Sequence, residues 1–309
     1  MKKLLEALTI PMGVSGYEHE IRELVEQYKP EGFDSRVDPV GNLIWSKGSP
    51  TTVFTAHMDE IGLMVSGYKD GKLEFVTVGG FDPRSLPNHI VTLADGRKGV
   101  IGLPAPHITK DKDRVIPIDE LVIDIGAKDD EEAEKIAPVG TTAVIDCESF
   151  MLNDHEYVGR NTDNRSGVAV MIAIANYLSD RSDVAFVFTV REEVGLMGAK
   201  GIQESALFDA EYINIDVTTA GTLGSGCIVS LKDGAYMANA DMVKTFKEIG
   251  AKNFEVGKGG TSDHAALQYF RKACGISLPS AYIHSHVSKV SINDMADAAR
   301  LCIKYVESK

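Results

Sequence analysis

The sequence predicts an α/β fold in which a helix-covered sheet is split by an inserted all-β segment. After Tyr157, helical patterns alternate with short apolar strands, which is typical of a sheet layered by helices. Between about Gly62 and Cys147, short alternating segments are separated by turn residues instead, which is typical of an all-β module. With 309 residues and 44% hydrophobic content, the chain is long enough for more than one domain.

Two helices and three strands are expected before the insertion. Residues 1–13 predict a short amphipathic helix, and apolar residues at helical spacing predict a second helix over residues 18–28. Two strands are expected over residues 35–45, and the apolar run at residues 53–56 predicts a short buried strand. This last strand leads directly into His57.

The inserted segment is expected to hold short strands and a single helix over residues 130–136. Its strands are LEFVTV, HIVTL, GVIGL, LVIDI and TTAVID. In the last part of the chain, helices are expected over residues 164–178, 240–249 and 293–306 and between the first two strands. The strands expected there are VAFVFTV, YINIDV and CGISL.

Composition excludes several classes of function. A formal net charge of -13 and a sequence pI near 5.1 argue against a nucleic-acid partner, whose phosphates demand a basic face. The four cysteines are far apart and include no Cys-x-x-Cys pair, so we expect neither a thiolate zinc site nor disulfides, and a reducing cytoplasm is the expected compartment. No run of about 18 apolar residues predicts a membrane span, and Glu6 and Pro11 interrupt the only candidate for a signal peptide.

Polar side chains gather where the predicted strands end. Glu192 and Glu193 follow the run AFVFTV, and two adjacent carboxylates at the end of a buried strand call for a counter-charge, for which a divalent metal is the leading candidate. His57, Asp216 and His284 also end apolar segments, which is where open α/β sheets place their ligands. Each residue also has an ordinary interpretation, as a turn former, a hydrogen-bonded histidine or part of a solvated helix.

Asp163 begins a predicted helix, where an aspartate is usually an N-cap. Taken together with the strand-end residues, it completes a set of oxygen and nitrogen donors without thiolates. Such a set suits zinc, cobalt or manganese in a hydrolytic site. Two ions about 3.5 to 4 Å apart can activate one water together. One carboxylate of the Glu192 and Glu193 pair would then stay free as a general base, and Asp59 could orient His57.

The chain resembles the TET-type and glutamyl aminopeptidases, a family of cytosolic dinuclear metallopeptidases. The resemblance runs in the family's order from Leu4 to the final helix. The stretches that carry it are GVSGYEHEIR, DPVGNLI, TAHMDEIGLMV, VGGFDP, GRNTDNRSGVAV, REEVGLMGA, INIDVT, GGTSDHAA and YIHS. No single stretch is specific to this family, but the occurrence of all of them in this order is.

The resemblance implies a three-layer zinc-peptidase α/β domain over residues 1–62 and 147–309. It also implies an inserted, β-barrel-like dimerisation domain over residues 63–146. Family members remove N-terminal residues from short peptides, and they assemble as dimers or as shells of up to twelve subunits. We therefore expect a homo-oligomer with peptides as its partners.

Residue by residue, the resemblance implies a ligand set for two divalent ions per subunit, zinc or cobalt first and manganese next. The ligands of one ion would be His57 and Asp216, those of the other Glu193 and His284, and Asp163 would bridge the two. Glu192 matches the family's general base, and Asp59 matches the carboxylate behind the His57 ligand. All seven positions hold the residue type that the family uses.

Some positions depart from the family's pattern. Arg191 stands where Gln is usual, Met197 stands where Arg is usual, and His286 follows the last ligand where the family has Pro or a small residue. These differences bear on substrate preference and assembly rather than on the metal centre. Three alternatives remain open: a deacylase or other amide hydrolase on the same centre, a glycosidase that needs only two carboxylates, and an inactive assembly scaffold.

Overall fold

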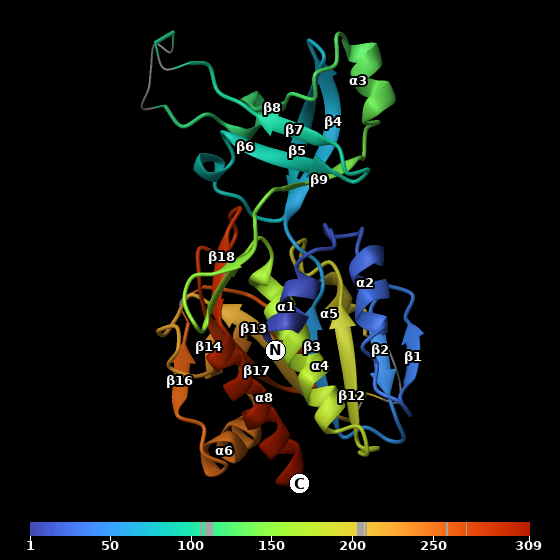
Figure 1. Ribbon diagram of the computed structural model, residues 1–309. Coiled ribbons are helices and arrows are strands. Elements are labelled where there is room, and N and C mark those ends of the chain that lie inside the picture. Colours follow the sequence, from blue (N-terminus) through green and yellow to red (C-terminus); the bar gives the residue numbers. More distant parts are fainter. Residues whose placement is uncertain (106, 109–113, 203–206, 208, 258, 270) are drawn as a thin grey trace.

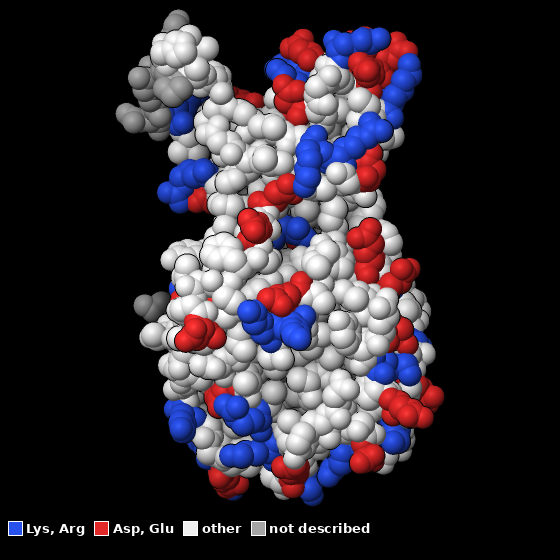
Figure 2. All heavy atoms as spheres, in the orientation of Figure 1, with Lys and Arg blue, Asp and Glu red and all other residues white. Residues whose placement is uncertain are grey.

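The computed structural model describes residues 1–105, 107–108, 114–202, 207, 209–257, 259–269 and 271–309. Its strands form two sheets, one of twelve strands and one of six, which lie in two parts of the molecule with a narrow junction between them (Figures 1 and 2). On the face shown in Figure 2, acidic and basic side chains are interspersed. Among the described residues, no helix has the length and apolar character that a membrane span requires.

The large sheet has parallel strands at its centre. Its main path runs β1-β2-β12-β3-β13-β17-β18-β11-β10, and β12, β3, β13 and β17 pair in parallel. Its strands are β1 (Asp34–Val37), β2 (Leu43–Ser46), β3 (Thr52–His57), β10 (Phe150–Met151), β11 (Glu156–Gly159), β12 (Val184–Thr189), β13 (Glu211–Thr218), β14 (Ile228–Asp233), β15 (Tyr236–Met237), β16 (Asn253–Val256), β17 (Lys272–Ala281) and β18 (Ser288–Ser291).

Helices cover both faces of this sheet. They are α1 (Lys2–Leu8), α2 (His19–Glu26), α4 (Thr162–Tyr177), α5 (Met197–Lys200), α6 (Ala240–Glu248), α7 (Asp263–Leu267) and α8 (Ile292–Glu307). Every residue of β12 is buried, because successive side chains point to opposite faces. Phe186 and Phe188 join the core that includes α4 and α8, whereas Ala185 and Val187 join the smaller core beneath α5 and α7. Three layers result, as the sequence predicts.

The small sheet lies within residues 62–145 and closes on itself. Its elements are β4 (Gly62–Lys69), β5 (Lys72–Val78), the 3-10 helix η1 (Pro83–Ser85), β6 (His89–Leu93), β7 (Lys98–Ile101), the 3-10 helix η2 (Ile118–Glu120), β8 (Val122–Ile123), α3 (Asp130–Ile136) and β9 (Thr142–Ile145). The strand order is β7-β6-β9-β4-β5-β8, and Val100 of β7 exchanges two backbone hydrogen bonds of 2.9 Å with Asp124 beyond β8. This bridge gives the sheet its barrel-like form, and it encloses a separate apolar core.

The predicted fold class is confirmed, while several elements differ in detail. Helix α3 has the predicted bounds, and α8 extends the predicted helix by one residue at each end. Strand β4 is absent from the prediction because its register shifts between Val65 and Gly67, which breaks the alternation of apolar residues. Strands β10, β11, β14, β15, β16 and β18 and helix α7 are also additions, and all are short or weakly patterned.

A buried ion-pair cluster joins the N-terminal segment, the end of β3 and the start of α4. The Glu60 carboxylate accepts hydrogen bonds from Arg160 Nε at 2.6 Å, from Arg165 Nη2 at 3.3 Å and from the Gly13 backbone at 3.0 Å. Arg165 Nη1 also donates to the Leu8 carbonyl at 2.6 Å. Burial lowers the pKa of Arg165 to about 10, so it remains charged at neutral pH. This cluster fixes α4 against the first residues of the chain.

Replacing Glu60 with glutamine should destabilise the protein by about 3 kcal/mol, because the fully buried Arg165 would lose a charged partner. The shift of the urea midpoint measures this loss. Glu131→Gln is the matched control, since Glu131 pairs with Lys135 at 2.7 Å on an exposed helix face and should contribute less than about 0.5 kcal/mol. Equal midpoints for both variants would contradict the role of the cluster.

Candidate active site

The predicted site residues meet at one edge of the large sheet. His57 is the last residue of β3, Glu192 and Glu193 follow β12, Asp216 lies in β13, and His284 follows β17. Because these four strands run parallel, their carboxyl ends lie at the same edge, where α/β sheets place their ligands.

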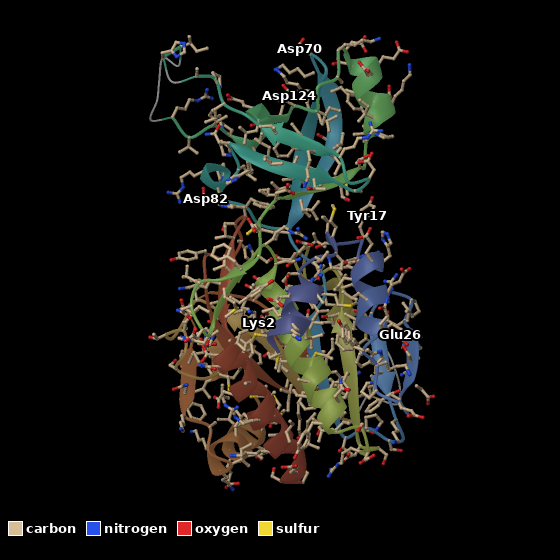
Figure 3. The ribbon with its side chains drawn as sticks, in the orientation of Figure 1. Lys2, Tyr17, Glu26, Asp70, Asp82 and Asp124 are labelled. Atoms are coloured by element: carbon tan, nitrogen blue, oxygen red, sulfur yellow. The ribbon has the colours of Figure 1, made fainter. Side chains whose placement is uncertain are left out.

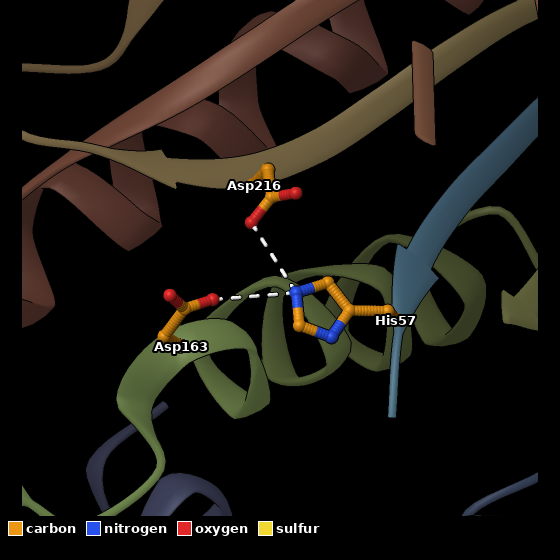
Figure 4. Close-up of side chains that lie close together, drawn as sticks. All are labelled: His57, Asp163 and Asp216. Atoms are coloured by element: carbon orange, nitrogen blue, oxygen red, sulfur yellow. Dashed lines mark ion pairs between the residues drawn. The ribbon is translucent and has the colours of Figure 1, made fainter. Parts of the chain in front are cut away.

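One group of side chains surrounds the buried ring of His57. Its Nε2 lies 3.2 Å from Asp163 Oδ1 and 3.7 Å from Asp216 Oδ1 (Figure 4). Asp163 comes from the first turn of α4, which is held against β13 because Asn164 Nδ2 donates to the Ile215 carbonyl at 2.8 Å. The backbone of Asp163 and Asn164 is not helical and forms a kink at the start of α4. The contact of this kink with β13 brings the Asp163 carboxylate to the strand-end histidine.

A second group surrounds His284, whose side chain is 43% exposed. Its Nε2 lies 3.7 Å from Asp163 Oδ2 and 3.7 Å from Glu193 Oε2. The two oxygens of Asp163 therefore face different histidines. Glu192, which is buried, forms a third group with Glu193 and His57, in which one ligand atom from each lies within 4.8 Å of the others.

Asp59 contacts residues of all three groups. Its side chain is fully buried, and Oδ1 lies 3.4 Å from His57 Nδ1 and accepts the backbone N–H of Glu192 at 3.0 Å. Its Oδ2 accepts the Ser15 hydroxyl at 2.5 Å and the backbone N–H of Glu193 at 3.2 Å. The backbone carbonyl of Asp59 also lies 3.2 Å from His57 Nδ1. Asp59 therefore orients the His57 ring through its carbonyl and its carboxylate, and the carboxylate also fixes the backbone of the acidic pair.

The site brings several carboxylates together, and most of them have little exposure to solvent. Burial raises the pKa of Glu192 and Glu193 well above the usual value, and neighbouring carboxylates raise both further. Burial would lower the pKa of His57, but the surrounding aspartates hold it above the usual value. Converging carboxylate oxygens and imidazole nitrogens of this kind are the donors that a divalent cation requires, so the residues present fit a metal.

The sequence did not predict a series of side-chain hydrogen bonds that supports Asp216. The Ser262 hydroxyl donates to Asp216 Oδ2, Asn214 Nδ2 donates to Ser262 Oγ at 2.7 Å, and Thr55 donates to Asn214 Oδ1 at 2.8 Å. Ser262 lies in the GGTSDHAA stretch, which the resemblance singles out without naming a function. The only signal in the sequence was this motif, because the contacts join residues far apart in the chain.

The two unusual residues near the site lie in different places. Arg191 is exposed, and a Cβ placed on Gly16 would lie 3.9 Å from its Nε, while its backbone N–H donates to Glu18. Because the pKa of Glu192 is raised by its burial, Arg191 does not hold that carboxyl ionised. His286 packs against His89 of the small sheet, with ring centroids 3.9 Å apart and planes inclined by 37°, and it is partly buried rather than an exposed loop residue.

A cavity of about 880 Å³ is lined by the site residues themselves and extends toward β14 and β16. Its walls include the acidic residues Asp233 and Glu255 and the hydroxyl groups of Thr218, Ser230 and Ser277. A cavity of this size accommodates a short peptide segment.

A buried cluster of carboxylates and imidazoles at the strand ends of an α/β sheet is typical of metal-dependent hydrolases. The sequence matches the M42 glutamyl aminopeptidase family over residues 41–301, and the chain belongs to this family. It is therefore a peptide hydrolase, and the family implies that it uses divalent metal. The confirmed family relationship agrees with the resemblance found in the sequence.

Similar proteins span nearly the whole chain. A putative aminopeptidase of Acetivibrio thermocellus is 32% identical over 99% of this chain and 98% of its own. A lysyl aminopeptidase of Pyrococcus furiosus is 31% identical, over 99% of this chain and 96% of its own. The solved structure of the Pyrococcus horikoshii TET1 peptidase is 34% identical over 98% of each chain, with a TM-score of 0.91.

Adding a divalent ion to chelated protein should raise its melting temperature, because binding relieves the repulsion among the clustered carboxylates. Ligand present at 100 times its Kd stabilises the folded state by about 2.7 kcal/mol, a shift of several degrees. Thermal unfolding followed by circular dichroism measures this shift with zinc, cobalt and manganese.

The rise should disappear in Asp216→Ala and persist in Asp180→Ala, which removes an exposed carboxylate beyond the carboxyl end of α4. An unchanged melting temperature in the unmutated protein would refute metal binding at this site.

Proposed function

We propose that the protein removes N-terminal residues from peptides at a centre of two divalent ions. The observation that carries the proposal is Asp163, whose two oxygens face the two histidines on either side of it. His57 and Asp216 would hold one ion, and Glu193 and His284 the other, with Asp163 between them. Zinc or cobalt suits these donors best, and manganese is the next candidate.

When bound, two such ions polarise a carbonyl and activate a water for attack on it. Glu192 is the carboxylate of the acidic pair that remains unligated, and it acts as the general base. It takes a proton from the attacking water and delivers it to the leaving amine. Its position supports this role, since Asp59 fixes its backbone N–H at 3.0 Å and its side chain is buried beside His57.

The remaining residues select and orient the substrate. The acidic cluster attracts the free ammonium group at the start of a peptide, which makes the enzyme an exopeptidase. The adjoining cavity, with the hydroxyl groups of Thr218 and Ser277 among its walls, receives the side chain of the residue to be removed. Short peptides are the substrates that such a site accepts.

The proposal also assigns a role to each of the two parts of the chain. Residues 1–62 and 147–309 form the catalytic domain, and residues 63–146 form the dimerisation domain. Exposed apolar side chains on the small sheet, including Val76, Ile90 and Val100, support its use in assembly. The P. horikoshii relative is described as assembling into a tetrahedron or a large octahedral shell, and we propose a homo-oligomer here, from a dimer up to a dodecamer.

A cytoplasmic location completes the proposal. The four cysteines are free in the structure, and three of them are buried. Free thiols are maintained in a reducing compartment.

Glu192→Gln should retain both ions and lose about 10²- to 10⁴-fold in kcat, because the amide cannot accept a proton. Metal analysis and hydrolysis of an aminoacyl-nitroanilide panel measure the two effects separately. Glu193→Gln is the matched comparison, since it removes a proposed ligand and should lower metal content. Full turnover by metal-loaded Glu192→Gln would refute the proposed role.

Peptides with a free N-terminus should be cleaved, whereas the same peptides carrying an N-acetyl group should not. The reason is that acetylation removes the ammonium group that the acidic cluster attracts. Comparing kcat/KM for each pair of peptides tests the proposal. Faster cleavage of the acetylated peptides would favour a deacylase or another amide hydrolase on the same framework.

A further inference from the structure

The loop over residues 282–287 carries His284 from the end of β17 to the site. Two of its residues, Tyr282 and His284, have left-handed backbone with φ of 64° and 56°. Residues other than glycine keep this conformation only where their surroundings hold them in it. Within the loop, Ser285 Oγ lies 2.7 Å from the carbonyl oxygens of Tyr282 and Val287. Those contacts shape the loop, but they do not place it against the rest of the molecule.

One external contact acts on His284 directly. Its Nδ1 lies 3.1 Å from the carbonyl oxygen of Gly80, in the segment that follows β5 of the small sheet. A carbonyl oxygen only accepts, so Nδ1 donates the hydrogen bond and Nε2 keeps its lone pair toward Asp163 and Glu193. A Cβ on Gly80 would lie only 3.2 Å from Nδ1, so glycine allows this close approach.

A second external contact acts two residues further on. The rings of His286 and His89 lie with centroids 3.9 Å apart and planes inclined by 37°. His89 is the first residue of β6, so this contact also comes from the small sheet. Across the described part of the chain, the buried His286 Nδ1 has no hydrogen-bond partner. The contact therefore depends on the flat surfaces of the rings rather than on a hydrogen bond from that nitrogen.

We propose that His89 and His286 are positioning residues, which clamp the 282–287 loop to the small sheet so that His284 is held as a metal ligand. The inference rests on the proposed metal centre and deepens it. Under this proposal, binding of the ion held by Glu193 and His284 depends on the inserted part of the chain. Binding of the ion held by His57 and Asp216 does not. Both parts of the molecule are then needed for a complete site.

Calorimetric titration of chelated protein with cobalt tests the clamp. His286→Ala and His89→Ala should each lower the affinity for the second ion, held by Glu193 and His284, about tenfold. This is the lower end of the effect of removing a partner that supports a metal ligand. The affinity for the first ion, held by His57 and Asp216, should not change. His286→Phe should bind both ions much as the unmutated protein does, because phenylalanine keeps the ring contact. The double alanine variant should be no worse than either single variant, since both remove one interaction.

His19→Ala is the matched control, because it removes an exposed histidine from α2 without touching the loop. The first ion serves as an internal test of folding, since a misfolded variant would lose both ions. The clamp is refuted if either alanine variant binds the second ion as tightly as the unmutated protein does, or if His286→Phe binds it as weakly as His286→Ala does. It is also refuted if an alanine variant whose circular dichroism spectrum is unchanged loses both ions together. Failure of the unmutated protein to bind two ions would instead overturn the dinuclear centre, and the clamp with it.

Discussion

The structure depends on the two adjacent buried carboxylates that follow β3. Asp59 turns toward the site, where it orients His57 and holds the backbone of Glu192. Glu60 turns the other way and pairs with Arg160 and Arg165, which fixes the start of α4. A buried carboxylate persists only when its charge is matched, so both residues constrain everything that they contact. Within four residues, the chain supplies a site residue, its orienting group and the anchor of the helix that faces it.

The clustering of buried carboxylates at the site lowers the stability of the folded protein. Burial and mutual repulsion raise the pKa of Glu192 and Glu193, and no lysine or arginine among the described residues forms an ion pair with either carboxylate. The surrounding sheet and helices hold these groups together, because their backbone positions are set by parallel strand pairing and by the hydrogen bonds to Asp59. A bound cation would reverse the sign of the local electrostatics. Binding of a cation at this site would therefore also stabilise the folded protein.

The junction between the two parts is another place where distant segments meet. Tyr17, which lies at this junction in Figure 3, approaches the carbonyl of Gly140 at 3.4 Å. Gly79, which directly follows β5 of the small sheet, approaches Glu193, since a Cβ placed there would lie 3.3 Å from Glu193 Cβ. The inserted part thus borders the site on the side of Glu193 and His284. In an assembly built through the small sheet, subunit contacts would act close to the site.

The sequence alone determined the α/β class, the place of the insertion and the seven residues that gather at the strand ends. Apolar periodicity sets the elements, and the carboxyl ends of parallel strands meet at one edge of a sheet. Each polar residue there also had an ordinary structural interpretation, and the resemblance to a known family is what singled out the set of seven. Only the tertiary structure decided what those residues contact. Segments far apart in the chain meet where Arg191 approaches Gly16, where His286 packs against His89 and where Ser262 donates a hydrogen bond to Asp216. Such contacts depend on how the layers pack, which no local pattern encodes.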